Sequence, residues 1–141
     1  MSRLFVVVLL ALAACSAPIA TPVTHTQAAA PVTATSQAAT TDATDPTGMS
    51  NNGWKITTFT MKADGAGNWG ANARMTNATG ADKKAAAFTV TVLDASKNVV
   101  TTLVGSATSV AKDATVTVQL VSLDKYTTGT YLYAFQVDAS Y

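Results

Sequence analysis

The sequence predicts an all-β fold for residues 51–141, a small antiparallel sandwich of about six to seven strands. Two observations predict it: apolar or aromatic residues alternate with polar ones, and turn residues recur about every 8 to 12 positions. No stretch of this region has a helical period of apolar residues. A region of roughly 90 residues is long enough to bury a core without disulfides.

The alternation of side chains defines each predicted strand in turn. It is clearest at Phe88, Val90 and Val92, which face away from Thr89 and Thr91. Asp, Asn and Gly gather between the strands, where turns need them. Strands are predicted at about 53–62, 71–77, 88–92, 99–105, 115–120 and 131–137, with turns or loops at 64–68, 80–84, 94–98, 111–113 and 126–129.

Residues 88–100 resemble the central hairpin of the FxLYD-type domains, which are small immunoglobulin-like β-sandwiches of bacterial envelope and secreted lipoproteins. Residues 71–77 and 131–138 also look like strands of that family, so the resemblance covers about 52–141. The chain departs from the family at Leu93-Asp94, where the family often has Leu-Tyr-Asp. The resemblance implies a fold and a location but no reaction. The paired cysteines of antibody domains are missing, so the immunoglobulin likeness is architectural.

The N-terminus is typical of a signal peptide. Arg3 supplies a positive charge, and an unbroken apolar run follows from Leu4 to Ala14. This run is shorter than the roughly 20 residues that a membrane-spanning helix needs. We therefore predict a removable leader at residues 1–14 rather than a retained transmembrane anchor.

The end of the apolar run, Leu12-Ala13-Ala14-Cys15, resembles the bacterial lipobox. The resemblance implies that signal peptidase recognises Leu12, Ala13 and Ala14, and that Cys15 carries the lipid. More than one acyl chain gives firm membrane attachment, because each buried methylene contributes about 0.8 kcal/mol. The predicted location is the bacterial cell envelope. Ser16 favours the outer membrane if the cell has two membranes, and otherwise the outer face of the cell membrane is expected. The alternative is an ordinary secretory signal that happens to contain Cys.

Residues 15–50 are predicted to form a disordered tether. They consist mainly of Ala, Thr, Pro, Ser and Gln, and they contain no aromatic residue. Such a composition buries too little apolar surface to offset the entropy of ordering the chain. His25 lies in this stretch, where an exposed solvated side chain is expected.

Composition excludes several function classes. The net charge of +1 lacks the basic excess of nucleic-acid binders. All eight acidic residues are Asp, and the one His and one Cys lie outside residues 51–141. A Ser-His-Asp triad therefore cannot form within this region. The sequence predicts no catalytic residue, no metal site and no cofactor, and hence no enzyme.

Three weak ligand candidates have simpler explanations. Asp94-x-Ser96-x-Asn98 copies the first oxygen ligands of a calcium loop, but the Gly and terminal Glu of that loop are missing. Asp64 with Asn68 is a weaker version of the same pattern. Asp side chains that bond to the backbone of a turn explain both. Met61 and Met75 are soft donors for copper, but because no His is nearby, strand side chains in the core or at its edge explain them better.

Aromatic and polar surface candidates remain. Trp54, Tyr133 and Phe135 are predicted to fill the core, whereas Trp69 and Tyr141 are predicted to be exposed. Lys83-Lys84 is interpreted as a solvated loop tip. The residues 77–79 match a glycosylation sequon that a bacterial lipoprotein would leave bare.

The leading hypothesis is therefore a non-enzymatic, membrane-anchored envelope lipoprotein whose sandwich binds an envelope protein or glycan. An exposed edge strand is one way to take such a partner. The alternative is a passive structural component, or a phage- or plasmid-borne lipoprotein that blocks the surface against an incoming agent. The sequence does not predict which residues bind.

Overall fold

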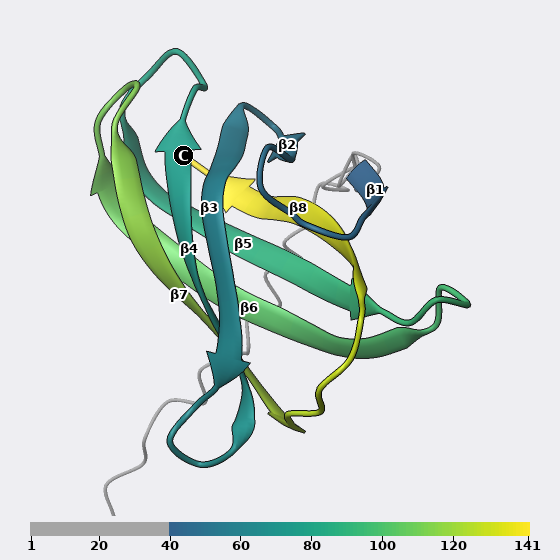
Figure 1. The fold of residues 1–141 in the computed structure, drawn as a ribbon. Coiled ribbons are helices and arrows are strands. Elements are labelled where there is room, and N and C mark those ends of the chain that lie inside the picture. The colour runs from purple at the N-terminus through teal and green to yellow at the C-terminus, as the bar shows by residue number, and fades with distance from the viewer. Residues whose placement is uncertain (1–39) are drawn as a thin grey trace, which may run out of the picture. The chain divides into compact units, whose positions relative to one another are not determined.

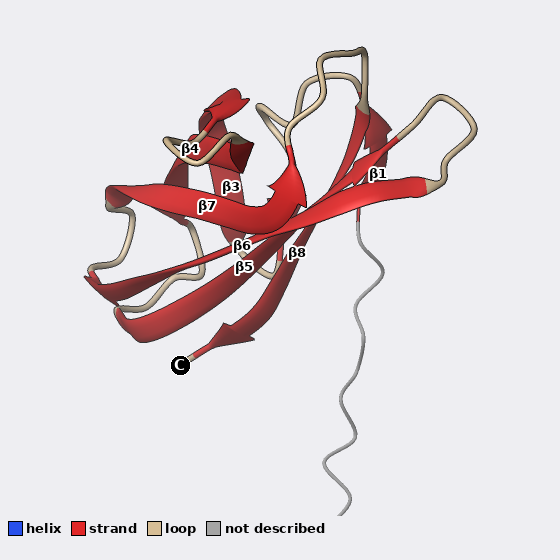
Figure 2. Ribbon diagram, turned by 90° about the horizontal axis from the view of Figure 1, so that it is seen from below, coloured by secondary structure: helices blue, strands red, loops and turns tan. Residues whose placement is uncertain are grey.

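The structure, a computed structural model, describes residues 40–141, with side chains from residue 44 onward. All regular elements in this range are strands, which confirms the predicted all-β fold (Figures 1 and 2). The predicted leader, 1–14, and most of the predicted tether lie outside the described residues. The strands are β1 (Thr40–Ala43), β2 (Ser50–Asn51), β3 (Trp54–Ala63), β4 (Asn68–Asn77), β5 (Lys83–Leu93), β6 (Val99–Val110), β7 (Thr115–Lys125) and β8 (Leu132–Ser140).

Within residues 40–141 the strands form one continuous antiparallel sheet in the order β1-β8-β5-β6-β7-β4-β3-β2. The sheet folds over so that β8, β5 and β6 make one layer and β7, β4 and β3 make the other (Figure 2). Side chains from both layers share one core, as in the predicted sandwich. The layers are not separate sheets, however, because the β6–β7 hairpin continues from one into the other.

The passage from one layer to the other depends on a close approach of β6 to β7. Val104 and Val121 form the residue pair by which the two strands join in the sheet. A Cβ atom on Gly105 would lie only 2.5 Å from the carbonyl oxygen of Gln119. A side chain therefore does not fit at residue 105, and glycine permits the two backbones to cross.

The core combines large aromatic side chains from both layers. Trp54 of β3 packs edge-on against Phe88 of β5, with ring centroids 4.9 Å apart. Phe59 of β3 contacts Tyr133 of β8 in the same way at 5.5 Å. Trp54, Tyr133 and Phe135 are all buried, as the sequence predicts. Such edge-to-face pairs stabilise the core beyond the burial of their surface.

Two strands extend past their predicted ends. The sequence predicts a loop at 80–84, but β5 already begins at Lys83 and pairs there with Val110 of β6. β6 correspondingly continues to Val110 rather than ending near Gly105. Ser109 has a positive φ of 54°, which breaks the side-chain alternation and turns Val110 into the core. A prediction that relies on alternating apolar and polar residues ends a strand where such an irregularity interrupts the alternation.

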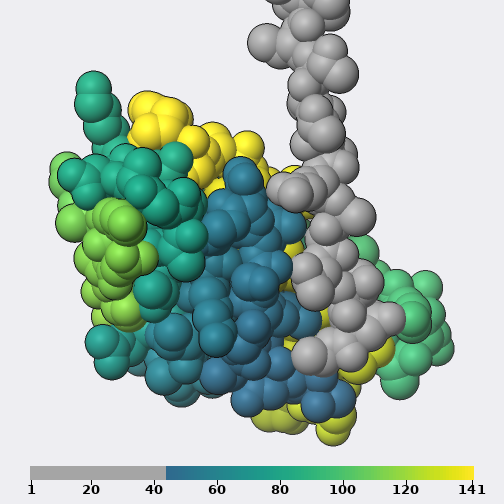
Figure 3. Space-filling view, turned by 90° about the horizontal axis from the view of Figure 1, so that it is seen from above, coloured from purple at the N-terminus to yellow at the C-terminus, as the bar shows by residue number. Residues whose placement is uncertain are grey.

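The folded region begins earlier than composition suggests. Residues 40–50, assigned to the tether by their composition, include β1 on the edge of β8 and β2 on the edge of β3. Pro46 and Met49, in the segment that connects β1 to β2, are buried. Ile56 of β3 donates its N–H to the carbonyl of Met49 at 2.9 Å. In the space-filling view, the first coloured part of the chain (blue), which includes β2 and β3, lies beside the C-terminal residues (yellow) (Figure 3). These residues form strands because they pair with β8 and β3. The composition of a short Ala/Thr/Pro-rich stretch does not indicate such pairing.

Candidate functional site

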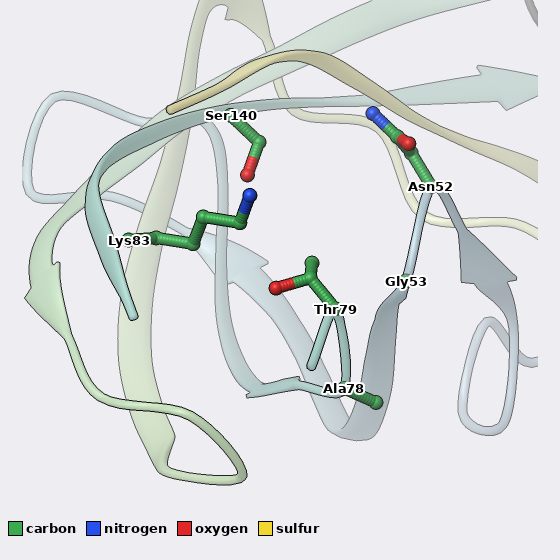
Figure 4. Close-up of a pocket in the computed structure, with 6 residues that line it drawn as sticks. All are labelled: Asn52, Gly53, Ala78, Thr79, Lys83 and Ser140. Atoms are coloured by element: carbon green, nitrogen blue, oxygen red, sulfur yellow. The ribbon is translucent and has the colours of Figure 1, made fainter. Parts of the chain in front are cut away.

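A polar groove with a volume of about 330 Å³ opens at one end of the sandwich. Its lining residues come from four separate parts of the chain, and Figure 4 shows the Lys83 amine reaching toward the Ser140 hydroxyl. They are Asn52, Gly53, Ala78, Thr79, Lys83 and Ser140. We call this end, residues 52–53, 77–83, 109–114 and 140–141, the groove end.

A tight turn forms the first wall. Asn52 and Gly53 connect β2 to β3, and both have positive φ angles, 46° and 76°. Asn-Gly is the favoured dipeptide for this kind of hairpin turn, because both positions need the left-handed conformation. A Cβ atom on Gly53 would lie 2.9 Å from the Cα of Thr79, so the turn packs directly on the β4–β5 loop.

Asn77 fixes the second wall. Its amide nitrogen donates toward three carbonyl oxygens: Ala81 at 2.9 Å, Ala111 at 3.1 Å and Val110 at 3.2 Å. Its amide oxygen accepts the Thr79 hydroxyl at 2.6 Å and the Thr79 N–H at 3.2 Å. Asn77 is completely buried, so each lost bond would leave a polar group without water. The sequon asparagine is therefore a structural residue, and its amide is not accessible for modification in the folded domain.

Trp54 positions Ser140, which forms the third wall of the groove. Its indole N–H donates to the Ser140 hydroxyl at 3.0 Å, while its ring is buried in the core. Lys83 stands across from Ser140 because β5 pairs with β8, where Ala86 lies opposite Ser140. Lys83 is half-buried in a strand, so its interpretation as a solvated loop tip is wrong.

The groove carries one positive charge and no carboxylate in its lining. The neighbouring Asp82 faces a second cavity of about 350 Å³, which it shares with Lys83 and Lys84. One carboxylate oxygen of Asp82 accepts the N–H of Lys112 at 2.8 Å. The carboxylate closest in sequence to Lys83 thus lies outside the groove.

The opposite end of the sandwich, residues 64–69 and 125–131, is closed by aromatic rings. Trp69 packs edge-on against Tyr126 and Tyr131, with centroids 4.7 and 5.0 Å apart. Only 1% of Trp69 is exposed, so the prediction of an exposed Trp69 is wrong. Its ring lies on the core side of the β3–β4 hairpin, where the β7–β8 connection covers it. We call residues 64–69 and 125–131 the aromatic end. Tyr141, in the groove end, is 72% exposed, as predicted.

The calcium-like candidates are hairpin turns. Asp94 accepts the N–H groups of Ser96 and Asn98, each at 2.8 Å, and the Asn98 side chain at 3.0 Å. These bonds, with the side-chain bond from Asn98 as the largest cause, lower the pKa of the Asp94 carboxyl. Asp64 accepts the N–H groups of Ala66 and Asn68 in the same way, at 2.8 Å each. The bond from Asn68 is the largest cause of its lowered pKa.

The other candidate residues are not brought together. Met75 lies opposite Ile56 in the sheet, whereas Met61 lies opposite Ala71 near the other end of the same strand pair. Residues 44–141 contain no group of three or more His, Cys, Asp or Glu side chains that could hold a metal ion. Leu12, Ala13, Ala14, Cys15 and His25 lie outside the described residues.

A small apolar patch is exposed on the outer face of β6 and β7. Val104 and Val121 face each other across the two strands, and Leu123 is 93% exposed. Thr102 and Gln119, both exposed and polar, lie on the same two strands. Three exposed apolar side chains form only a small patch, and scattered residues of this kind are common on domain surfaces.

Comparisons with known proteins identify no relative: no protein-family model, curated protein or solved structure matches the chain. In the described part of the chain, no helix is both long and apolar enough to span a membrane.

The groove was not predictable from sequence patterns. Its residues are separated by up to 88 positions, and the 77–79 sequon, which includes two of them, does not indicate a groove. The one local signal is Asn52-Gly53, which marks a hairpin turn and so a well-defined surface loop.

Proposed function

We propose that this protein is a lipid-anchored component of the bacterial envelope whose β-sandwich is a non-catalytic binding module, with the groove end as its contact surface. The observation that carries the proposal is the groove itself. It combines a half-buried lysine, two hydroxyls and an amide in a preformed frame. A few convergent polar groups in a concave, rigid site are typical of ligand recognition.

The membrane part of the proposal rests on the sequence. An apolar run ending in Leu12-Ala13-Ala14-Cys15 provides a lipidation site, and the Ala/Thr/Pro-rich residues after it provide reach. The non-catalytic part rests on composition. The region from 51 onward has no His, Cys or Glu, which are the usual acids, bases and nucleophiles.

In-cell photo-crosslinking tests this proposal. A crosslinking amino acid is placed at Asn52, in the groove wall, and separately at Leu123, on the apolar patch far from it in the sheet. We expect a discrete envelope partner to be trapped from position 52 and not from position 123. The same experiment with Cys15→Ser should lose both acyl labelling and the crosslink.

Three outcomes contradict the proposal or one of its parts. Trapping of the same partner from Leu123 and not from Asn52 would move the contact surface away from the groove. Abundant surface protein with no crosslink from either position would favour the passive or blocking role. Normal processing and acyl labelling of Cys15→Ser would contradict the lipid anchor independently of the groove.

A further inference from the structure

We propose that the groove recognises an acidic sugar, through a carboxylate that binds Lys83 and an adjacent hydroxyl that binds Thr79. This inference rests on the proposed binding function and adds the chemical class of the ligand. It follows from which hydrogens and lone pairs each groove residue has left after its internal bonds.

Lys83 supplies the positive charge. No described carboxylate forms an ion pair with its ammonium, and Asp82 turns to the neighbouring cavity. The amine instead points into the groove toward the Ser140 hydroxyl (Figure 4). The ammonium of a half-buried lysine that faces an open groove is a binding point for an anionic group.

Ser140 adds a donor beside that charge. Its oxygen already accepts the indole N–H of Trp54 at 3.0 Å. Its own hydroxyl hydrogen has no acceptor among the described protein groups, so it remains to donate to a ligand oxygen. Lys83 and Ser140 therefore offer donors from two sides of the groove to the same oxyanion.

Thr79 acts as a hydrogen-bond acceptor toward a ligand, whereas Lys83 and Ser140 act as donors. Its hydroxyl hydrogen is shared between the Asn77 side-chain oxygen at 2.6 Å and the Ala81 carbonyl at 3.1 Å. Only its lone pairs remain, so toward a ligand it acts as an acceptor. A ligand that satisfies Lys83, Ser140 and Thr79 together needs an oxyanion and a donor such as a hydroxyl nearby.

The shape and lining favour a sugar over a peptide. A volume of about 330 Å³ is at the small end of ligand sites, which run from roughly 300 to 1,000 Å³. The lining contributes Ala78 as its one apolar side chain, which offers no deep pocket for an apolar anchor. Asn52, held by its turn, offers both a donor and an acceptor to further hydroxyls. A uronic acid carries this combination of groups.

Titration calorimetry with the full chain in detergent tests the inference. The probes are trigalacturonate, the neutral sugar galactotriose, and inorganic phosphate. We expect trigalacturonate to bind at least 10-fold more tightly than galactotriose. Lys83→Gln should weaken trigalacturonate binding at least 10-fold. Lys84→Gln, the matched charge change one residue away and outside the groove, should change it less than twofold.

Further variants separate binding from folding. Lys83→Arg keeps the charge and should retain binding within a fewfold of the original chain, which shows that position 83 tolerates substitution and that binding depends on its positive charge. Equal binding by Lys83→Gln and the original chain would overturn the inference. Equal binding of galactotriose, or tighter binding of inorganic phosphate than of trigalacturonate, would also overturn it. If position 52 still traps an envelope partner while no sugar binds, the ligand class is wrong and the proposed binding function stands.

Discussion

The two ends of the sandwich are closed by different chemistry. At the aromatic end, Trp69 is covered by Tyr126 and Tyr131, and nearly all of its surface is buried. At the groove end, Asn77 closes the fold by hydrogen bonds to the β4–β5 loop and to the β6–β7 turn. Both solutions exclude water from the core.

Under the proposed function, the difference predicts which end binds a ligand. At the aromatic end the exposed polar side chains bond within that end: Lys125 donates to the Ala66 carbonyl at 2.8 Å, and the Tyr131 hydroxyl donates to the Thr127 carbonyl at 3.1 Å. Hydrogen bonding through Asn77 instead orders the β4–β5 loop, and the Lys83 amine of β5 and the Ser140 hydroxyl of β8 face the groove beside it (Figure 4). We infer that the aromatic end is structural and that the groove end is functional. The following variants test this division, from the largest expected effect to the smallest.

Trp69→Ala should cause the largest loss of stability. Removal of a fully buried indole leaves a cavity at the aromatic end, which typically costs about 3–5 kcal/mol. Chemical denaturation measures the loss. Tyr141→Ala, which changes an exposed ring, is the control and should change the free energy of unfolding by less than about 0.5 kcal/mol. Comparable losses for the two variants would show that Trp69 does not close its end.

Asn77→Ala should destabilise the groove end by about 2–4 kcal/mol, because each buried partner left unsatisfied costs roughly 1–3 kcal/mol and the loop can partly rehydrate. The exposed Asn72 on the same strand provides the control substitution, Asn72→Ala. Hydrogen exchange should show the greatest loss of protection at 78–82 and 111–114. A uniform loss of protection over the whole domain would contradict a local role for Asn77.

Gly53→Ala should destabilise the domain by about 2–3 kcal/mol. The backbone there has a φ of 76°, and the new methyl group would lie 2.9 Å from the Cα of Thr79. Gly65→Ala is the matched change in the β3–β4 turn of the aromatic end, where nothing lies within 4 Å of the added carbon. Thermal unfolding should separate the two variants clearly, and equal melting temperatures would argue against tight packing of the groove wall.

Lys97→Gly should raise the free energy of unfolding by about 0.5–1 kcal/mol, because a non-glycine residue in the left-handed region is strained. The 94–98 turn repeats the hydrogen bonding of the 64–68 turn, with Lys97 at φ 65° where the latter has Gly67 at φ 75°. The reverse change, Gly67→Lys, should destabilise the domain. Denaturation midpoints that shift the other way in either variant would show that the two turns are not equivalent.

Acid should remove the smallest contribution. The pKa values of the Asp64 and Asp94 carboxyls are lowered in the folded domain. Each carboxyl therefore stabilises the fold above its unfolded pKa of about 3.9, and this contribution is lost as the pH falls through the folded value. Asp94→Asn should reduce stability at pH 7, and the difference should shrink toward pH 2. A constant difference over this range would contradict the lowered pKa.

The sequence predicts most of the strands, because one face of each is buried and the alternation is visible. For this reason the sequence correctly predicts that Phe88, Val90 and Val92 share the buried face of their strand. It does not predict β1 and β2, which depend on pairing with the edges of β8 and β3. It also misses Lys83 as a groove residue, because the other lining residues come from the β2–β3 turn, the β4–β5 loop and β8. Such residues are brought together only by the fold.

Amide chemical-shift mapping is the most direct test of the division between the two ends. Trigalacturonate is added to the isotope-labelled full chain in detergent, and the shifts are followed residue by residue. We expect the largest changes at 52–53, 79–83 and 140–141, and none at 64–69 or 125–131. Changes concentrated at the aromatic end, or on the Val104–Val121–Leu123 patch, would contradict the assignment of the groove as the binding site.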